Sequence, residues 1–341
     1  SECPLDKKRK EKIALSCNVS AGKVISAPDV ESIYDVPLNF EKDNIGEIIV
    51  RELGLSAREK KTDLALWKRF ITKTKTAERA IKVAIVGKYF DTGDFMLSDA
   101  YLSVIEALKF SAYHLGRTPE ISWLSAVEYE KHARAASELA KYDGILIPGG
   151  FGERGVEGKI RAIKFVREKR IPYFGLCYGM QLAIVEYARH VLGLKDAHTT
   201  EINQATPYPV IDILPEQKKL LERGDYGGTM RLGSYFAILK KGTVARKAYG
   251  KELIEERHRH RYEVNPDYIK ELAKGDLVFS GSSPDGKLME IAELSVKVHP
   301  FFLGTQFHPE FQARPLRPHP LFTAFLKVAC SRRDKKKNLR R

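Results

Sequence analysis

The middle of the chain alternates between short apolar runs and longer amphipathic segments. Apolar runs bounded by turn residues are typical of buried strands, and apolar residues that recur every three or four positions mark one face of a helix. The strands are predicted at 81–86, 120–124, 143–148 and 171–176, and the helices at 99–115, 132–141, 157–169 and 178–192. Because strands and helices take turns, the pattern predicts right-handed crossovers and a parallel sheet with helices on both faces.

Beyond about residue 205 the pattern changes to shorter strands separated by turns. The predicted strands are 206–213, 229–239, 256–264, 277–283, 288–294 and 301–307. One helix is expected near 266–274 and a last one at 320–328. The predicted fold class is therefore α/β, with a mostly parallel central sheet and added antiparallel strands.

The N-terminal segment has a different character. Residues 1–55 hold two helical patterns, at Lys8–Ser16 and Ile45–Leu53, and an apolar strand at Lys23–Ile25. This is too little apolar material to close a core alone. We therefore interpret 1–55 as the remnant of a larger domain, and because the chain starts at Ser1 without a methionine, we expect an upstream region.

The net charge is concentrated in two segments. The 341 residues carry 58 Lys and Arg against 44 Asp and Glu, a formal charge of +14, and the 43% of hydrophobic residues excludes a wholly disordered chain. Residues 58–82 hold nine basic residues against three acidic, and 332–341 hold seven against one. The remainder is nearly neutral, so the charge alone does not predict nucleic-acid binding. We predict a basic linker helix at 56–80, a main domain at 81–330 and a basic, disordered tail at 331–341.

The cysteines and the hydropathy limit the cellular setting. Cys3, Cys17, Cys177 and Cys330 form no CxxC pair, which argues against a disulfide framework and against a zinc site. No apolar run approaches the roughly 18 residues of a membrane span, and the N-terminus has no hydrophobic signal core. We expect a cytoplasmic protein with no metal site and no membrane partner.

Gly175-Leu176-Cys177-Tyr178-Gly179 has the form of a nucleophile elbow at a predicted strand-to-helix junction. Small residues two positions before and after the nucleophile are needed because side chains would collide in so tight a turn. At a helix N-terminus the free N–H groups and the helix dipole favour the thiolate and lower the pKa of a cysteine. The alternative is an inert buried cysteine with glycines used for packing.

His308-Pro309-Glu310 follows the last predicted strand and can supply the base. In an extended segment residues i and i+2 project to the same side, so Glu310 can accept a hydrogen bond from one ring nitrogen of His308 while the other nitrogen faces the thiol. Alone, this motif would favour a surface histidine at a capped strand end. Together with the cysteine elbow it favours a Cys-His-Glu triad.

A glycine-rich turn follows the strand predicted at 143–148. The segment 148–152 can direct backbone N–H groups at a developing oxyanion. The overlapping segment 150–155 also matches G-x-G-x-x-G, the dinucleotide fingerprint. The next strand, however, ends in Leu176-Cys177 where a ribose-binding acid would be needed, so the dinucleotide interpretation is the weaker one.

Arginine and histidine alternate from Arg257 to Arg261. As a strand, this segment places three arginines on one face and two histidines on the other. The arginines could bind an anion, the histidines could pair on a metal, or the strand could be an ordinary basic one beside Glu255 and Glu256. No further ligand cluster supports a metal, so we favour an anion or carboxylate role for at least one arginine.

The segments GLCYGMQ, PGGFGERG, TQFHPEF and ERHRHRYEVN together resemble the class I glutamine amidotransferase domain of the CTP synthase family. Upstream, CPLDKKRKEKIALSC and VISAPDVESIYDVP resemble the end of that family's synthetase (amidoligase) domain, and GGTMRLG resembles another of its motifs. The resemblance implies a class I amidotransferase fold, which is flavodoxin-like. The elbow and HPE are common to many amidotransferases, whereas the upstream segments and RHRHR point to the CTP synthase family.

The resemblance also implies catalytic roles. Cys177 would be the nucleophile, His308 the general base and acid, and Glu310 its orienting partner. Gly150 would help to form the oxyanion hole with the backbone N–H of Tyr178. Tyr178 departs from the family pattern, in which leucine is usual, so its side chain can alter access to the nucleophile.

Binding residues follow from the same resemblance. The residues expected to hold the ammonium and carboxylate groups of glutamine are Gln181, Glu201 and Arg261. Those expected at nucleotide sites are Asp29 and Val30, near the family's adenine site, and Arg231, where the family binds its activator GTP. The family also implies a homo-oligomer, namely a tetramer.

The implied reaction divides between two active sites. Glutamine hydrolysis needs no cofactor, whereas the complete enzyme uses ATP, UTP and Mg²⁺ with GTP as activator to aminate UTP to CTP. That second step needs a phosphate loop GxxxxGK[ST], which does not occur here, so we expect this chain to hydrolyse L-glutamine and to lack the synthetase site. Two alternatives stay open: the glutaminase of another amidotransferase such as GMP synthetase, which 1–55 speaks against, and a non-catalytic interaction module whose basic tail binds nucleic acid.

Overall fold

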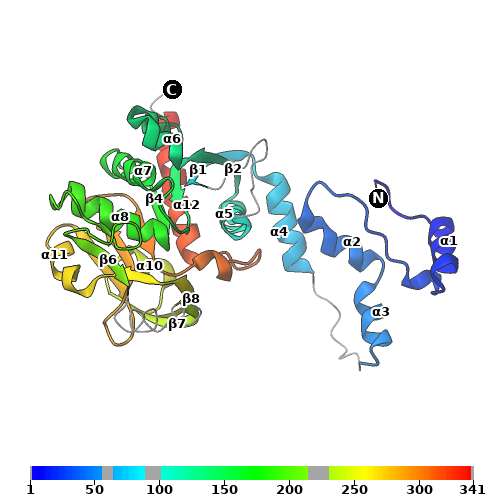
Figure 1. The fold of residues 1–341 in the computed structure, drawn as a ribbon. Coiled ribbons are helices and arrows are strands. Elements are labelled where there is room, and N and C mark those ends of the chain that lie inside the picture. Colours follow the sequence, from blue (N-terminus) through cyan, green and yellow to red (C-terminus); the bar gives the residue numbers. More distant parts are fainter. Residues whose placement is uncertain (1, 56–63, 89–100, 214–229, 339–341) are drawn as a thin grey trace. The chain divides into compact units, whose positions relative to one another are not determined.

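The computed structural model describes residues 2–55, 64–88, 101–213 and 230–338 (Figure 1). The chain separates into two compact units, Ser1–Thr76 and Ala77–Arg341. Each unit is described by itself, beginning with the larger one, which contains the elbow and the HPE motif.

A nine-stranded sheet forms the centre of the larger unit, in the order β2-β1-β3-β4-β12-β11-β10-β7-β8. Its first five strands are parallel: β2 (Arg117–Ser125), β1 (Arg79–Gly87), β3 (Gly144–Ile147), β4 (Tyr173–Leu176) and β12 (Phe302–Thr305). The other four continue it antiparallel: β11 (Met289–Leu294), β10 (Leu277–Ser282), β7 (Arg231–Leu239) and β8 (Leu253–His260). The predicted fold class is therefore confirmed; all four antiparallel strands come from beyond residue 205, where the sequence pattern changes, but β12 from the same region pairs parallel with β4.

Helices cover the parallel half of the sheet. They are α5 (Leu102–His114), α6 (Ala126–Lys131), α7 (Val156–Glu168), α8 (Tyr178–His190) and α12 (Pro320–Asn338). α8 is buried along nearly its whole length, and β3 and β4 are buried at every position, as expected for strands covered on both faces. A second sheet of β5 (His198–Thr199), β6 (Pro209–Ile213) and β9 (Tyr262–Val264) lies beyond α8 in the chain.

Three segments of the larger unit differ from the prediction. Residues Ala133–Lys141 form a 3₁₀ helix rather than an α-helix, and α10 (Val244–Tyr249) had no clear sequence pattern. α12 runs on to Asn338, so the tail predicted as disordered from 331 is helical up to that residue. The physical reason is that its last turns are anchored by ion pairs, from Asp334 to Arg117 at 2.7 Å and from Arg333 to Asp143 at 2.8 Å. Residues 339–341 lie outside the described part.

The smaller unit is mainly helical. It contains α1 (Lys7–Cys17), α2 (Val36–Lys42), α3 (Ile45–Glu52), α4 (Ala65–Thr76) and two 3₁₀ turns, Ala21–Lys23 and Ile33–Asp35. The strand predicted at Lys23–Ile25 was wrong: Lys23 ends a 3₁₀ turn, and Ser26 donates its N–H to Asp43 at 2.7 Å instead of to a neighbouring strand.

α4 takes the place of part of the predicted linker helix, whose residues 56–63 lie outside the described part. Its Phe70 and Ile71 are buried, and the Phe70 ring meets Tyr34 at 5.1 Å between ring centroids. Trp67 Nε1 donates to the Tyr34 carbonyl at 2.9 Å. α4 therefore packs as a member of the N-terminal unit.

Candidate active site

Cys177 occupies a strained turn between β4 and α8. Its φ of 51° and ψ of −100° place it outside the regions that non-glycine residues normally adopt. A Cβ on Gly175 would come within 2.5 Å of the Tyr173 hydroxyl, and one on Gly179 within 2.3 Å of the Ile147 carbonyl oxygen. The tight elbow geometry predicted from the glycine spacing is therefore present, and it sets the thiol at the first turn of α8.

His308 faces this thiol from the end of β12. Its Nδ1 lies 2.7 Å from Glu310 Oε1, and its backbone N–H donates to the Arg257 carbonyl at 2.8 Å. The pair does not form across an extended segment, as the sequence suggested, because Pro309–Gln312 is a 3₁₀ turn that folds Glu310 back onto the ring. Burial would lower the pKa of His308, but the negative charges of Glu310 and of the Cys177 thiolate raise it well above its ordinary value.

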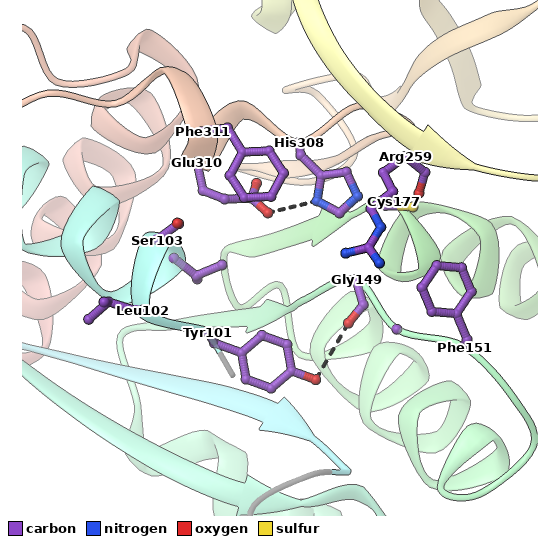
Figure 2. A pocket seen from close by; sticks show the side chains of 12 residues that line it. Tyr101, Leu102, Ser103, Gly149, Phe151, Cys177, Arg259, His308, Glu310 and Phe311 are labelled. Carbon is purple, nitrogen blue, oxygen red and sulfur yellow. Dashed lines mark hydrogen bonds and ion pairs between the residues drawn. The ribbon is translucent and has the colours of Figure 1, made fainter. Parts of the chain in front are cut away.

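The triad lines a cavity of about 290 Å³. Figure 2 shows the His308 ring between Glu310 and the Cys177 sulfur, with Gly149 opposite and Tyr101 donating its hydroxyl to the Gly149 carbonyl at 3.5 Å. The other lining residues are Leu102, Ser103, Val104, Gly150, Phe151, Arg259 and Phe311. A thiol, a base and a flexible backbone turn thus meet in one opening that a small substrate can enter.

The glycine turn after β3 borders this cavity. A Cβ on Gly149 would lie 2.8 Å from His308 Cε1, so the backbone approaches the catalytic ring closely. Glu201 Oε1 accepts the Gly152 N–H at 2.8 Å and fixes the far end of the turn. α7 begins directly after Gly155, so the turn does lead into a helix, but β4 ends in Leu176 and Cys177 and presents the thiol where a dinucleotide site needs an acid.

The residues expected to bind glutamine do not line the cavity among the described contacts. Gln181 is 2% exposed, and its side-chain amide donates to the Tyr262 carbonyl at 2.8 Å and to Gln306 Oε1 at 3.2 Å. Burial raises the pKa of Glu201, while Arg261 lies close enough to oppose this shift. The buried Nε of Arg261 has no hydrogen-bond partner in the part of the chain that the structure describes. Glu201 and Arg261 therefore gather near the Gly152 end of the turn, whereas Gln181 lies beneath the elbow.

The Arg257–Arg261 segment alternates as predicted. His258 and His260 are buried on β8, while Arg257 and Arg259 point outward. The Arg259 carbonyl lies 3.9 Å from Cys177 Sγ, so the strand contributes backbone to the site.

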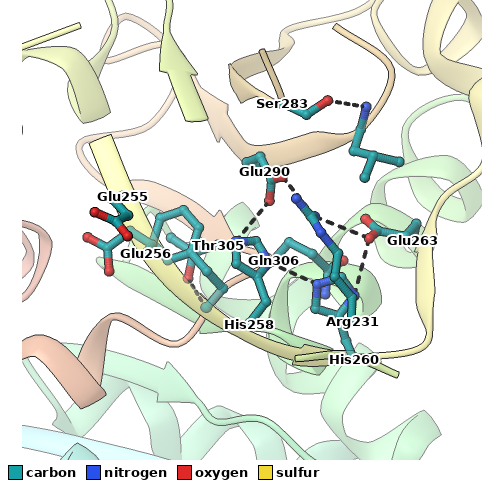
Figure 3. Close-up of polar contacts among 12 residues, drawn as sticks. Arg231, Glu255, Glu256, His258, His260, Glu263, Ser283, Glu290, Thr305 and Gln306 are labelled. Atoms are coloured by element: carbon teal, nitrogen blue, oxygen red, sulfur yellow. Dashed lines mark hydrogen bonds and ion pairs between the residues drawn. The ribbon is translucent and has the colours of Figure 1, made fainter. Parts of the chain in front are cut away.

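A buried cluster of ionisable groups supports this strand (Figure 3). Arg231 pairs with Glu290 at 2.9 Å and with Glu263 at 3.5 Å, and His258 Nδ1 lies 3.0 Å from His260 Nε2. The predicted nucleotide-site residue Arg231 is thus engaged by two carboxylates. The other two predicted nucleotide-site residues, Asp29 and Val30, belong to the N-terminal unit, where Val30 lines a separate cavity.

Besides the cavity-lining residues 101–104, sequence reasoning missed three further residues at the site. Gln306 Nε2 lies 3.7 Å from Cys177 Sγ, and the Phe311 ring stacks on His308 at 5.2 Å between centroids. Both flank the HPE motif, so proximity in sequence was an available signal. Lys159 is fully buried behind the glycine turn, and the sequence pattern indicated no role for it beyond its place in the helix predicted at 157–169.

Two further findings concern metals and membranes. Within residues 2–55, 64–88, 101–213 and 230–338, no group of three or more His, Cys, Asp or Glu side chains is placed to hold a metal ion. None of the helices in these ranges is long and apolar enough to cross a membrane.

Comparison with known proteins gives two family matches. Residues 96–328 match the model of the class I glutamine amidotransferases, and residues 1–55 match the model of the CTP synthase N-terminus. A solved glutaminase domain of the Trypanosoma brucei CTP synthase, described with bound acivicin, superposes with a TM-score of 0.67 and 34% sequence identity, over 74% of this chain and 94% of that one.

Curated relatives extend the similarity to nearly the whole chain. The CTP synthase of Pelotomaculum thermopropionicum is 51% identical over 329 residues, which are 96% of this chain and 59% of the relative. That of Methanococcus aeolicus is 46% identical over 341 residues, or 98% of this chain and 61% of the relative. The chain therefore spans about three fifths of the length of these relatives.

Proposed function

The chain belongs to the CTP synthase family, within the class I glutamine amidotransferases, and from this premise we propose that it hydrolyses L-glutamine to glutamate and ammonia. The observation that supports this best is the Cys177 thiol on a strained turn beside the His308–Glu310 pair, with all three side chains on one cavity. Such a constellation suits acyl transfer through a covalent intermediate.

In the proposed mechanism the Cys177 thiolate attacks the side-chain carbonyl carbon of glutamine. The carbonyl electrons move onto oxygen, and the tetrahedral intermediate collapses as the carbon–nitrogen bond breaks. His308, protonated and held by Glu310, gives its proton to the departing ammonia. The product of this half-reaction is a glutamyl thioester on Cys177.

The second half-reaction restores the thiolate. His308 removes a proton from water, whose oxygen attacks the thioester carbonyl, and the carbon–sulfur bond breaks to release glutamate. The backbone N–H groups of Gly150 and Tyr178 stabilise the oxyanion in both halves. Glu201 and Arg261 hold the ammonium and carboxylate ends of glutamine, and Gln181 fixes the elbow from below through its bonds to Tyr262 and Gln306.

Ammonia from this site is proposed to aminate UTP to CTP at the expense of ATP, as the name of the relatives suggests. The GxxxxGK[ST] loop expected for that step does not occur in this sequence. The described residues do not fit Mg²⁺, since no group of three ligating side chains is formed there. Arg231 is not free to bind a GTP phosphate either, because it forms ion pairs with Glu290 and Glu263. We therefore route no step of the glutaminase reaction through nucleotide or metal.

The direct test is ammonia release from L-glutamine by the 341-residue chain. We expect steady release, and inhibition by acivicin, the compound named for the solved relative. A glutamine-derived chloroketone is expected to label Cys177 in preference to Cys3, Cys17 and Cys330, as read by peptide mass spectrometry. No ammonia release, or dominant labelling of another cysteine, would overturn the proposal.

A further inference from the structure

A lysine is buried behind the glycine turn of the active site. Lys159 on α7 is 0% exposed, and its Nζ has no hydrogen-bond partner among the described residues. A buried, unpaired ammonium group is strongly unfavourable unless it is neutral or stands near compensating charge.

The lysine amine faces the back of the oxyanion turn. Lys159 Nζ lies 5.2 Å from the centroid of the Tyr178 ring, in a cation–π arrangement, and 3.7 Å from where a Cβ on Gly150 would stand. The Gly150 site also lies 4.0 Å from Tyr178 Cδ1, so the ring, the amine and the turn meet. The side chain comes from α7, the ring from α8 and the turn from the end of β3.

Other groups hold the same turn from further elements. The Tyr178 hydroxyl donates to the Gly152 carbonyl at 3.3 Å, and Lys88 Nζ, at the end of β1, donates to it at 3.4 Å. Glu201 accepts the Gly152 N–H. Lys88 and Glu201 are also the charged groups that act on Lys159, with opposite sign.

We propose that Lys159 and Tyr178 form a positioning pair behind the oxyanion hole, in which the amine, held over the ring, supplies positive charge next to Gly150 when the tetrahedral oxyanion forms. The inference rests on the proposed glutaminase function.

The protonation of the Lys159 amine is expected to change during the reaction. Burial, and then the positive charge of Lys88, lower the pKa of Lys159 to about 7. An oxyanion held by the Gly150 N–H would raise this pKa, so the ammonium form is stabilised more in the transition state than in the free enzyme. Interactions that strengthen in the transition state accelerate the chemical step.

The test replaces the amine by an apolar side chain of similar length. In Lys159→Met we expect kcat for ammonia release to fall about 10-fold, less than the roughly 100-fold or more for loss of a direct oxyanion donor, with KM for glutamine within about 2-fold. The ratio of wild-type to variant rate is expected to be larger at pH 6.5 than at pH 8.5, because the amine is charged only on the acid side. Lys164→Met, a partly exposed lysine on the same helix, is the matched control and is expected to keep the wild-type rate.

Two measurements separate this role from a structural one. The thermal midpoint of Lys159→Met is expected to stay unchanged or to rise, since a buried unpaired charge has been removed. Alkylation of Cys177 by iodoacetamide, read by peptide mass spectrometry, is expected to keep its wild-type rate because that reaction forms no oxyanion.

Changes at Tyr178 complete the test. Tyr178→Phe keeps the ring and is expected to lose less activity than Tyr178→Leu, and Lys159→Met is expected to have a smaller effect in the Tyr178→Leu background. The positioning role of Lys159 and Tyr178 would be overturned by any of three results: an unchanged rate of ammonia release in Lys159→Met, a ratio of wild-type to variant rate that does not depend on pH, or slowing of Cys177 alkylation as large as the slowing of ammonia release. None of these results would contradict the proposed hydrolysis of glutamine. A wild-type chain that releases no ammonia would instead overturn the proposed function and the inference with it.

Discussion

Two histidine–glutamate groups flank β8, and they are built from the same residue types with opposite properties. In one, His308 pairs with Glu310 beside the Cys177 thiol, and its pKa is raised well above the ordinary value. In the other, burial and then the charge of Arg231 lower the pKa of His258 to about 2 and that of His260 to about 3. The first group lines the cavity described above.

The two groups differ in the cation that pairs with their carboxylates, which is Arg231 in the buried group and His308 in the other. Glu290 lies 3.6 Å from His258 Nε2, and Glu263 lies 3.3 Å from His260 Nδ1. Both carboxylates also pair with Arg231, whose positive charge, after burial, lowers the pKa values of these histidines. No such arginine competes for Glu310 among its hydrogen bonds, and His308 is the cation of its pair. A histidine next to a glutamate is therefore a base in one environment and a neutral packing element in the other.

The buried group nevertheless serves the reactive one through β8. Its histidines fix the inner face of the strand, and the strand's backbone reaches the triad: the Arg257 carbonyl accepts the His308 N–H, and the Arg259 carbonyl faces Cys177 Sγ. We expect substitutions in the two groups to have different effects. Substitutions in the His308–Glu310 group should reduce catalysis, whereas those in the buried group should alter the pH dependence of stability.

The largest effect is expected for Cys177→Ala. Without the nucleophile no thioester forms, so ammonia release from glutamine should fall by at least about 1000-fold. The urea midpoint should change little, because the replaced side chain is small. Ammonia release at the wild-type rate would end the assignment of Cys177.

A smaller loss is expected for Glu310→Gln. The carboxylate orients His308 and stabilises its protonated form but exchanges no proton with substrate, so kcat should fall about 30-fold with little change in KM. Steady-state ammonia release across pH measures this, and the ionisation of His308 should move to lower pH, because the negative charge that raises its pKa has gone. A loss as large as that of Cys177→Ala would mean that Glu310 takes a direct part in the chemistry.

The buried group of His258, His260, Glu263 and Glu290 is expected to make the free energy of unfolding depend on pH. Because the pKa of His258 is lowered from 6.5, the folded protein keeps this histidine neutral while the unfolded chain binds a proton below pH 6.5, and acid therefore destabilises the fold. Glu290 acts oppositely: burial raises its pKa from 4.5 to about 7, so between these values the folded protein holds a proton that the unfolded chain lacks.

Substitutions should therefore shift the pH dependence in opposite directions. Between pH 4.5 and 6.5, His258→Asn should lessen the fall of the unfolding free energy on acidification, and Glu290→Gln should steepen it, each by up to about 1.4 kcal/mol per pH unit. Urea titrations at several pH values, compared with wild type, measure the slopes. Parallel slopes in all three proteins would show that neither group is held as described.

Much of this contrast lay beyond the sequence. The elbow and the HPE motif could be predicted because each is local: two glycines around Cys177 fix a turn, and a single residue separates His308 from Glu310. The alternation of strands and helices likewise predicted the sheet. The Arg231 cluster joins side chains from β7, the adjacent strands β8 and β9, and β11, and no local pattern predicts that these segments meet.

Errors followed from the same limit. The tail from residue 331 resembled a solvated basic end, and only the tertiary ion pairs of Asp334 and Arg333 make it helical. The strand at Lys23–Ile25 had the right composition but no neighbouring strand. The burial of Lys159 could not be predicted either, because it depends on what packs around its helix, which periodicity does not report.

The smallest effect is expected for Phe311, the aromatic neighbour of His308. The Phe311 ring stacks on the His308 ring at 5.2 Å and 21°, and Phe311 is 40% exposed. Such a stack stabilises ring orientation by about 0.5–1.5 kcal/mol and carries no charge, so Phe311→Leu should lower kcat only about 3-fold and leave KM within about 2-fold. Phe311→Tyr should restore the rate, and Phe236→Leu on exposed β7 serves as a control with no expected change. If Phe311→Leu lost as much as Glu310→Gln, or if tyrosine failed to restore the rate, the ring would contribute more than orientation, and the carboxylate could no longer be regarded as the main partner of His308.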